Sequence, residues 1–217
     1  MTMTKQYILF DLDGTLTDPM EGITKSLQYA LQSFGITVKN REELKPFIGP
    51  PLRDTFRKCG IAERDIEPVV AKYREYFGVT GLFENTLYDG IDGLLSGLHD
   101  SGKTLILATS KAAVYAERIL EHFDIAKYFR FVSGCEMDGR RSKKSEVIGY
   151  ALLQCGIADA RQAVMIGDRE HDIIGAKECG MDSVGVLYGY GSREELTRAG
   201  VDRIVKDVAE LTALLRA

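Results

Sequence analysis

Apolar residues occur along the chain in short runs, separated by segments with a helical repeat. The first run, QYILF at residues 6–10, ends in acidic residues and a glycine, which is typical of a buried strand leading into a loop. Comparable runs follow later in the chain, at residues 104–108, 130–133, 163–166 and 183–187. Each run is predicted to be a strand.

Amphipathic helical segments lie between these runs. Residues 112–123 and residues 145–155 each place their apolar side chains on one helical face. Strands that alternate with helices predict an α/β fold, in which a parallel sheet is covered by helices on both faces. Ligands of such sheets bind at the carboxyl ends of the strands.

One long stretch, residues 19–83, breaks the alternation because it holds helical stripes and no convincing strand. The stripes include Ile23, Leu27 and Leu31, and later Val69, Val70 and Tyr73. We expect an all-helical domain here, inserted after the first strand. The predicted domains are residues 1–18 with 84–217, and residues 19–83, with hinges near Asp18-Pro19 and Phe83–Asp89.

The composition is that of an ordinary soluble globular protein, since 45% of the 217 residues are hydrophobic and 28% are charged. The formal net charge of -4 argues against binding to a nucleic acid polymer, which usually requires a basic face. An anionic substrate would need local positive charge, from a metal ion or from placed Lys and Arg side chains.

The four cysteines form no C-x-x-C pair, so we expect reduced and mostly buried thiols: Cys59, Cys135, Cys155 and Cys179. The N-terminal apolar run meets acids too early for a signal peptide. No apolar stretch approaches the roughly 20 residues of a membrane helix. These features predict a cytoplasmic protein without membrane contact.

The strongest chemical signal is Asp11-Leu12-Asp13-Gly14-Thr15, directly after the first strand. Two carboxylates two residues apart can reach one ligand site, and Gly14 allows a sharp turn. A carboxylate can attack phosphorus to form an acyl phosphate, and a second one can protonate the leaving oxygen and later deprotonate water. A capping turn would explain one aspartate but not this combination.

Three further sites follow later strands. Thr109 ends the run LILAT, where a hydroxyl can donate to a phosphoryl oxygen or cap a helix, and Ser110 comes next. Lys143 and Lys144 open a helix, after Arg140 and Arg141, which we interpret as a solvated basic run.

The last strand-end site is VMIGDREHD, with Asp168 and Asp172 after a buried strand. Asp172 is either a second acid of the site or only a helix N-cap. His171 is not expected to be a ligand, because Mg²⁺ prefers oxygen. Four carboxylates at adjacent strand ends repel one another unless a cation is present, and oxygen ligands favour Mg²⁺.

The segment FDLDGTLTD resembles the first motif of the haloacid dehalogenase-like superfamily. The resemblance implies a Rossmann-like fold, with Asp11 as nucleophile and Asp13 as general acid and base. It implies that Thr109 binds the phosphoryl group and that a lysine, best matched by Lys144, bridges nucleophile and phosphate. Ser110 and Ser145 stand where many relatives have Asn and Pro.

The same resemblance implies that Mg²⁺ is held by Asp11, the main-chain carbonyl of Asp13, and Asp168, with Asp172 close by. The helical insertion resembles the family's cap domain, which closes over the substrate. Similarity is greatest to phosphoglycolate phosphatase-like and 5′-nucleotidase-like members. Arg53 in the insertion either meets the substrate or lies on a solvated helix face.

These observations predict a Mg²⁺-dependent phosphomonoesterase that acts on a small phosphorylated metabolite, either phosphoglycolate or a nucleoside monophosphate, as a monomer or homodimer. A phosphomutase would use the same motifs and is the alternative enzyme. A phospho-accepting signalling module is disfavoured, because such modules carry no helical insertion.

Overall fold

The computed structural model describes residues 3–215 of the chain. Contacts divide it into two compact units, one built from the residues up to Asp18 and from Leu87 onward, the other from Pro19–Thr86. No helix in the described part is long and apolar enough to cross a bilayer.

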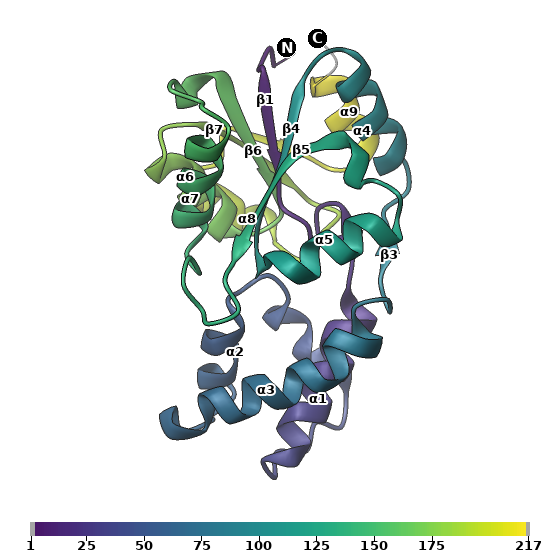
Figure 1. Ribbon diagram of the computed structural model, residues 1–217, viewed down its shortest axis with the longest axis vertical. Helices are drawn as coiled ribbons and strands as arrows, with labels where there is room; N and C mark the ends of the chain where they lie inside the picture. The colour runs from purple at the N-terminus through teal and green to yellow at the C-terminus, as the bar shows by residue number, and fades with distance from the viewer. Residues whose placement is uncertain (1–2, 216–217) are drawn as a thin grey trace. The chain divides into compact units, whose positions relative to one another are not determined.

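The first unit is built on a six-stranded sheet in which every neighbouring pair is parallel. Its strand order is β5-β4-β1-β6-β7-β8 (Figure 1). The strands are β1 (Tyr7–Phe10), β4 (Thr104–Ala112), β5 (Phe129–Cys135), β6 (Ala163–Gly167), β7 (Asp182–Val186) and β8 (Arg203–Val205). The predicted Rossmann-like α/β fold is confirmed.

Helices cover both faces of this sheet (Figure 1). The helices are α4 (Ile91–Asp100), α5 (Ala113–His122), α6 (Lys144–Gln154), α7 (Glu170–Glu178), α8 (Arg193–Ala199) and α9 (Val208–Leu215). Side chains alternate along each strand, so Leu9, Ile106 and Met165 join a core with α6 and α7 on one face. Their neighbours Ile8, Leu105 and Val164 are equally buried and point to the opposite face.

The direction of the chain across the sheet changes beside β1. From β1 the chain continues to β4 and β5 on one side, and then returns to β6 on the other. The carboxyl ends of β1 and β6 therefore flank the switch point, where open α/β sheets bind their ligands. Asp11 and Asp168 follow these two strands directly.

The second unit is helical and has its own core. It consists of α1 (Met20–Ser33), α2 (Leu52–Lys58) and α3 (Ile66–Tyr76), with a 3₁₀ segment at Arg41–Phe47 and a π-helical turn at Phe77–Gly81. The apolar stripes read from the sequence are buried in it, including Leu27, Leu31, Val69 and Val70. The connecting segments contribute the short strands β2 (Thr17–Asp18) and β3 (Thr86–Leu87), which pair with each other.

The structure corrects two sequence predictions and adds one strand that was not predicted. Strand β8 was not identified, because three residues with one buried side chain give too short a pattern. The four cysteines are free, as predicted, but they are half-buried rather than mostly buried. Arg141 is not part of a solvated run, because its guanidinium lies 3.8 Å from the centre of the Tyr150 ring and its side chain pairs with Glu136.

Candidate active site

The loop after β1 turns tightly, which brings Asp11 and Asp13 to the sheet edge. The N–H of Asp11 still donates to Ile166 O of β6 at 2.9 Å, so its backbone is held by the sheet. Gly14 has a φ of 82°, and a Cβ there would lie 2.2 Å from Asp168 Oδ2. Only glycine allows both this turn and this approach.

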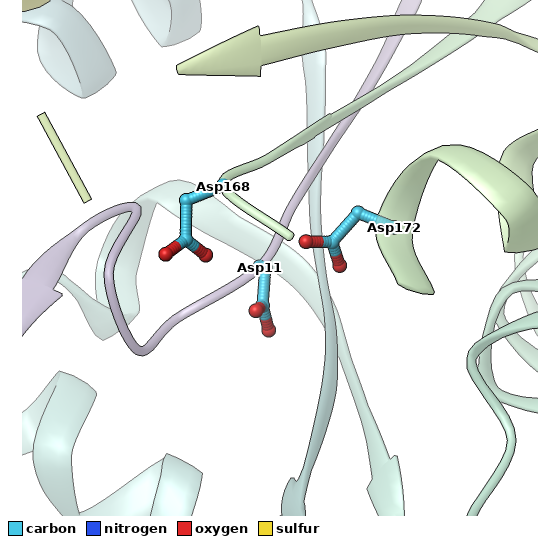
Figure 2. A group of neighbouring side chains, drawn as sticks. All are labelled: Asp11, Asp168 and Asp172. Atoms are coloured by element: carbon cyan, nitrogen blue, oxygen red, sulfur yellow. The ribbon is translucent and has the colours of Figure 1, made fainter. Parts of the chain in front are cut away.

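Three carboxylates meet in front of these strand ends: those of Asp11, Asp168 and Asp172. One oxygen of each lies within 4.8 Å of the others, and all three residues are buried (Figure 2). Asp11 and Asp168 come from the ends of β1 and β6, whereas Asp172 comes from the first turn of α7. His171 is not a member of this cluster.

Asp172 belongs to the acid cluster and also supports the start of α7, although the N-cap of this helix is Arg169 and not Asp172. Its Oδ2 accepts a hydrogen bond from the N–H of Arg169 at 3.1 Å, as a third-position residue of a helix start does. Its Oδ1 lies 2.8 Å from Nζ of Lys144. One carboxylate thus supports the start of α7 and belongs to the acid cluster.

Lys144 joins three elements at the site. Its Nζ lies 2.9 Å from Asp11 Oδ1 and 2.8 Å from Asp172 Oδ1, and it donates to Ala108 O of β4 at 3.0 Å. Lys143 is exposed instead. Successive helical residues point about 100° apart, so only one of the two lysines can face the sheet edge.

Burial dominates the electrostatics of the cluster, and the crowding of like charges adds to its effect on the acids. Burial together with the charges of Asp172 and Asp11 raises the pKa of Asp168 well above its usual range. Burial also raises the pKa of Asp172 to about 6, although the nearby Lys144 opposes this. Burial would lower the pKa of Lys144, but the two carboxylates outweigh it and raise the pKa.

The remaining predicted residues lie in different places. Asp13 is buried and forms an ion pair with Lys111. Thr109 is buried near the end of β4, where its Oγ1 accepts the N–H of Lys111 at 3.2 Å, and Ser110 beside it is half-buried. Arg53 lies in the first turn of α2 in the helical unit, where Glu67 accepts its Nε–H at 2.6 Å.

Sequence reasoning missed Lys111 and a group of tyrosines. The N–H of Tyr190 donates to Asp168 Oδ2 at 2.7 Å, and its hydroxyl donates to Asp18. Tyr188 donates to Thr15 O at 3.0 Å and packs edge-on against Tyr88. The pattern YGYG just after an apolar strand was the available signal.

Comparison with known proteins places the chain in a family. The sequence model of the haloacid dehalogenase-like hydrolases matches residues 8–186. A 5′-nucleotidase of Pseudomonas aeruginosa is 46% identical over 211 residues, which cover 97% of this chain and 95% of that protein. The tyrosine-protein kinase PtkA of Mycobacterium tuberculosis is 39% identical over 98% of this chain and 72% of its own length.

A solved structure agrees with this placement. The crystal structure of a predicted phosphatase from Clostridium acetobutylicum has a TM-score of 0.94 and 47% identity, covering 97% of this chain and 98% of that one. The resemblance read from the first acidic motif is thereby confirmed. The chain belongs to the haloacid dehalogenase-like hydrolase family and is an enzyme of that family.

Proposed function

We propose that this enzyme is a Mg²⁺-dependent phosphomonoesterase that transfers the phosphoryl group of a small metabolite to Asp11. The observation that carries the proposal is the buried meeting of Asp11, Asp168 and Asp172 with one lysine, Lys144, between two of them. Relatives whose names describe a 5′-nucleotidase and a predicted phosphatase support the same reaction class.

The acid cluster fits a divalent cation with oxygen ligands. Asp168 Oδ1 and Asp13 Oδ1 are buried, and neither accepts a hydrogen bond from any residue in the described part of the chain. The four carboxylates carry two more charges than Lys111 and Lys144 can offset. Asp11, Asp168 and the main-chain carbonyl of Asp13 would hold Mg²⁺, with Asp172 beside them. When bound, the ion would offset this charge and polarise the phosphoryl oxygens.

The side chains divide the chemistry between them. The Lys144 contact engages one oxygen of Asp11 and leaves the other to form a bond with phosphorus. As the bond from phosphorus to the leaving oxygen breaks, that oxygen takes a proton from Asp13. Asp13 then takes a proton from water, which attacks the acyl phosphate, frees Asp11 and yields inorganic phosphate. Thr109 would donate a hydrogen bond from its hydroxyl to a phosphoryl oxygen.

The helical unit is proposed to act as a cap that covers the leaving group of the substrate. The core residues touch only the phosphoryl group, which every phosphomonoester shares. Discrimination must therefore come from the leaving-group side, with Arg53 and Ser110 as candidate substrate-binding residues. We propose a nucleoside monophosphate or a phosphoglycolate-type substrate.

The test is hydrolysis of an aryl phosphate by the purified protein. EDTA should abolish turnover, added Mg²⁺ should restore it, and Ca²⁺ should substitute poorly because its coordination is looser. Asp11→Asn should remove turnover without unfolding the protein, whereas the matched control Asp124→Asn, at an exposed position, should not change it.

Covalent catalysis and substrate need separate measurements. Acid quenching during turnover should leave one hydroxylamine-sensitive phosphoryl group on the peptide that contains Asp11. Full activity after chelation, or in Asp11→Asn, would contradict the mechanism. A screen of nucleoside monophosphates, phosphoglycolate, sugar phosphates and pyrophosphate would rank substrates, and an isomerised sugar phosphate would indicate a phosphomutase instead.

A further inference from the structure

Lys111 is a buried cation next to the site that the proposed chemistry does not use. It is the last residue but one of β4, and its Nζ lies 2.8 Å from Asp13 Oδ2. The side chains of Lys111 and Asp13 are only 7% and 10% exposed. A lysine that is buried against one particular carboxylate needs an explanation beyond surface charge.

The local structure of β4 accounts for this placement. From Ile106 to Ala108, β4 pairs with consecutive residues of β5, but after the pair of Ala108 with Ser133 the next pair is Ala112 with Cys135. Between these two pairs, β4 has three residues and β5 has one, Gly134. The three residues of this bulged segment are Thr109, Ser110 and Lys111. Such bulges redirect side chains next to active sites.

The backbone of Lys111 is held from two sides. A Cβ on Gly134 of β5 would lie 2.6 Å from Lys111 O, so only glycine lets the neighbouring strand approach this closely. On the other side, the N–H of Lys111 donates to Thr109 Oγ1 at 3.2 Å. Because the backbone is fixed, the long side chain starts from a defined point on β4, and β4 is the neighbour of β1, the strand that leads to Asp13.

The pair leaves the two oxygens of Asp13 in different states. Oδ2 is engaged by Lys111, while Oδ1 is buried and accepts no hydrogen bond among the described residues. Burying two charges costs desolvation energy that their attraction repays only partly, so the pair is poorly explained as a stabilising device. It is better explained as a device that fixes one carboxylate and presents one oxygen.

The two buried lysines thus contact three of the four acids of the site, and they share none of them. Lys144 contacts Asp11 and Asp172, and Lys111 contacts Asp13. We propose that Lys111 is a positioning residue for Asp13, which holds its carboxylate so that Oδ1 reaches the leaving oxygen and later the attacking water. This inference rests on the proposed function of Asp13 as general acid and base.

The first test uses the dependence of rate on the leaving group. A 2,4-dinitrophenolate can leave as the anion, without a proton. An alkoxide is a much poorer leaving group and must be protonated as it leaves. On an alkyl phosphate, Lys111→Met should lower kcat/KM by roughly 10- to 100-fold, because a misplaced acid loses about that much. On 2,4-dinitrophenyl phosphate the loss should stay below about threefold. Equal losses on both substrates would overturn the inference and make Lys111 a phosphoryl-binding group.

The second test is a double-mutant cycle with Asp13→Asn. If Lys111 acts through Asp13, adding Lys111→Met to Asp13→Asn should cost less than about threefold more on the alkyl phosphate. If the two losses multiply, Lys111 acts independently and the inference is wrong. Lys111→Arg keeps the charge and should recover part of the loss on the alkyl substrate.

Controls separate this inference from folding and from the proposed function. Lys127→Met removes a lysine from an exposed pair with Asp124 and should leave both rates unchanged. If Lys111→Met does not fold, Lys111→Arg and Lys111→Gln carry the same leaving-group comparison. A wild-type protein without phosphatase activity would refute the proposed function. An active wild type with multiplying losses would refute only the role of Lys111.

Discussion

Ion pairs of similar length occur in both units of the molecule, but in opposite surroundings. In the sheet unit, Lys144 lies 2.9 Å from Asp11, and these side chains are 3% and 6% exposed. In the helical unit, Arg57 lies 2.8 Å from Glu63, and these side chains are 44% and 73% exposed. The length of an ion pair alone therefore does not distinguish a pair in a functional site from a pair at the surface.

The surroundings decide what each pair does. Exposed pairs gain little, because water screens them and two long side chains lose freedom. Buried pairs cost desolvation, and removal of one partner leaves an uncompensated charge. The sheet unit also gathers four aspartates around two lysines, an excess that folding alone would not favour. An unbalanced, buried charge cluster therefore indicates a chemical role, whereas balanced ion pairs at the surface contribute mainly to solubility.

The largest expected effect comes from breaking the buried set at Lys144. Lys144→Met leaves Asp11 and Asp172 without their common partner, so we expect a loss of about 3–5 kcal/mol in unfolding free energy and of nearly all turnover. Denaturant unfolding and steady-state kinetics measure the two effects. Lys143→Met, at the exposed neighbour, should change neither, and the reverse result would make Lys143 the bridging lysine.

Asp168→Asn should separate stability from activity. The substitution removes one charge from a cluster in which like charges repel by about 3 kcal/mol at an effective dielectric of 20. In EDTA, we therefore expect the variant to exceed the wild type by about 1–3 kcal/mol in unfolding free energy. Turnover with Mg²⁺ should nevertheless collapse, since a ligand is lost.

The expected gain in unfolding free energy of Asp168→Asn should also depend on pH. The folded-state pKa of Asp168 is raised, so its ionisation costs stability increasingly as pH rises above the unfolded value. The stability advantage of Asp168→Asn should therefore grow between mildly acidic and alkaline pH in EDTA. A variant less stable than wild type throughout this range would contradict the charge-crowding argument.

Arg53 tests whether an ion pair of the helical unit also serves the substrate. Its guanidinium makes two hydrogen bonds to Glu67, and its side chain is 22% exposed. Arg53→Ala should lower kcat/KM for the best substrate of the screen by about tenfold, the value of one good polar contact. Acetyl phosphate, which has little leaving group to recognise, should lose much less. Equal losses on both would assign Arg53 to stability.

The smallest effect is expected at Arg57, one turn further along α2. It pairs with Asp54 and Glu63 at the surface. Arg57→Ala should leave the unfolding midpoint and the substrate ranking almost unchanged, and high salt should remove any remaining difference. A large loss of stability would contradict the expectation that exposed ion pairs contribute little to the stability of the helical unit.

The sequence by itself determined the α/β alternation, the positions of the acids and the family. Local patterns carry this information. A buried strand followed by acids and a glycine can be recognised from the spacing and order of its residues, without knowledge of the fold. Asp11, Asp13 and Asp168 could be selected for this reason, before any contact between them was known.

Only the tertiary structure decided which side chains meet. The choice between Lys143 and Lys144 depends on the direction of one helix, and Lys111 depends on a bulge in β4 and on Gly134 from the next strand. Tyr190 reaches Asp18 across 172 residues of sequence and Asp168 across 22 residues. Such long-range approaches leave no periodic trace in the chain, because packing, rather than local propensity, fixes side-chain direction.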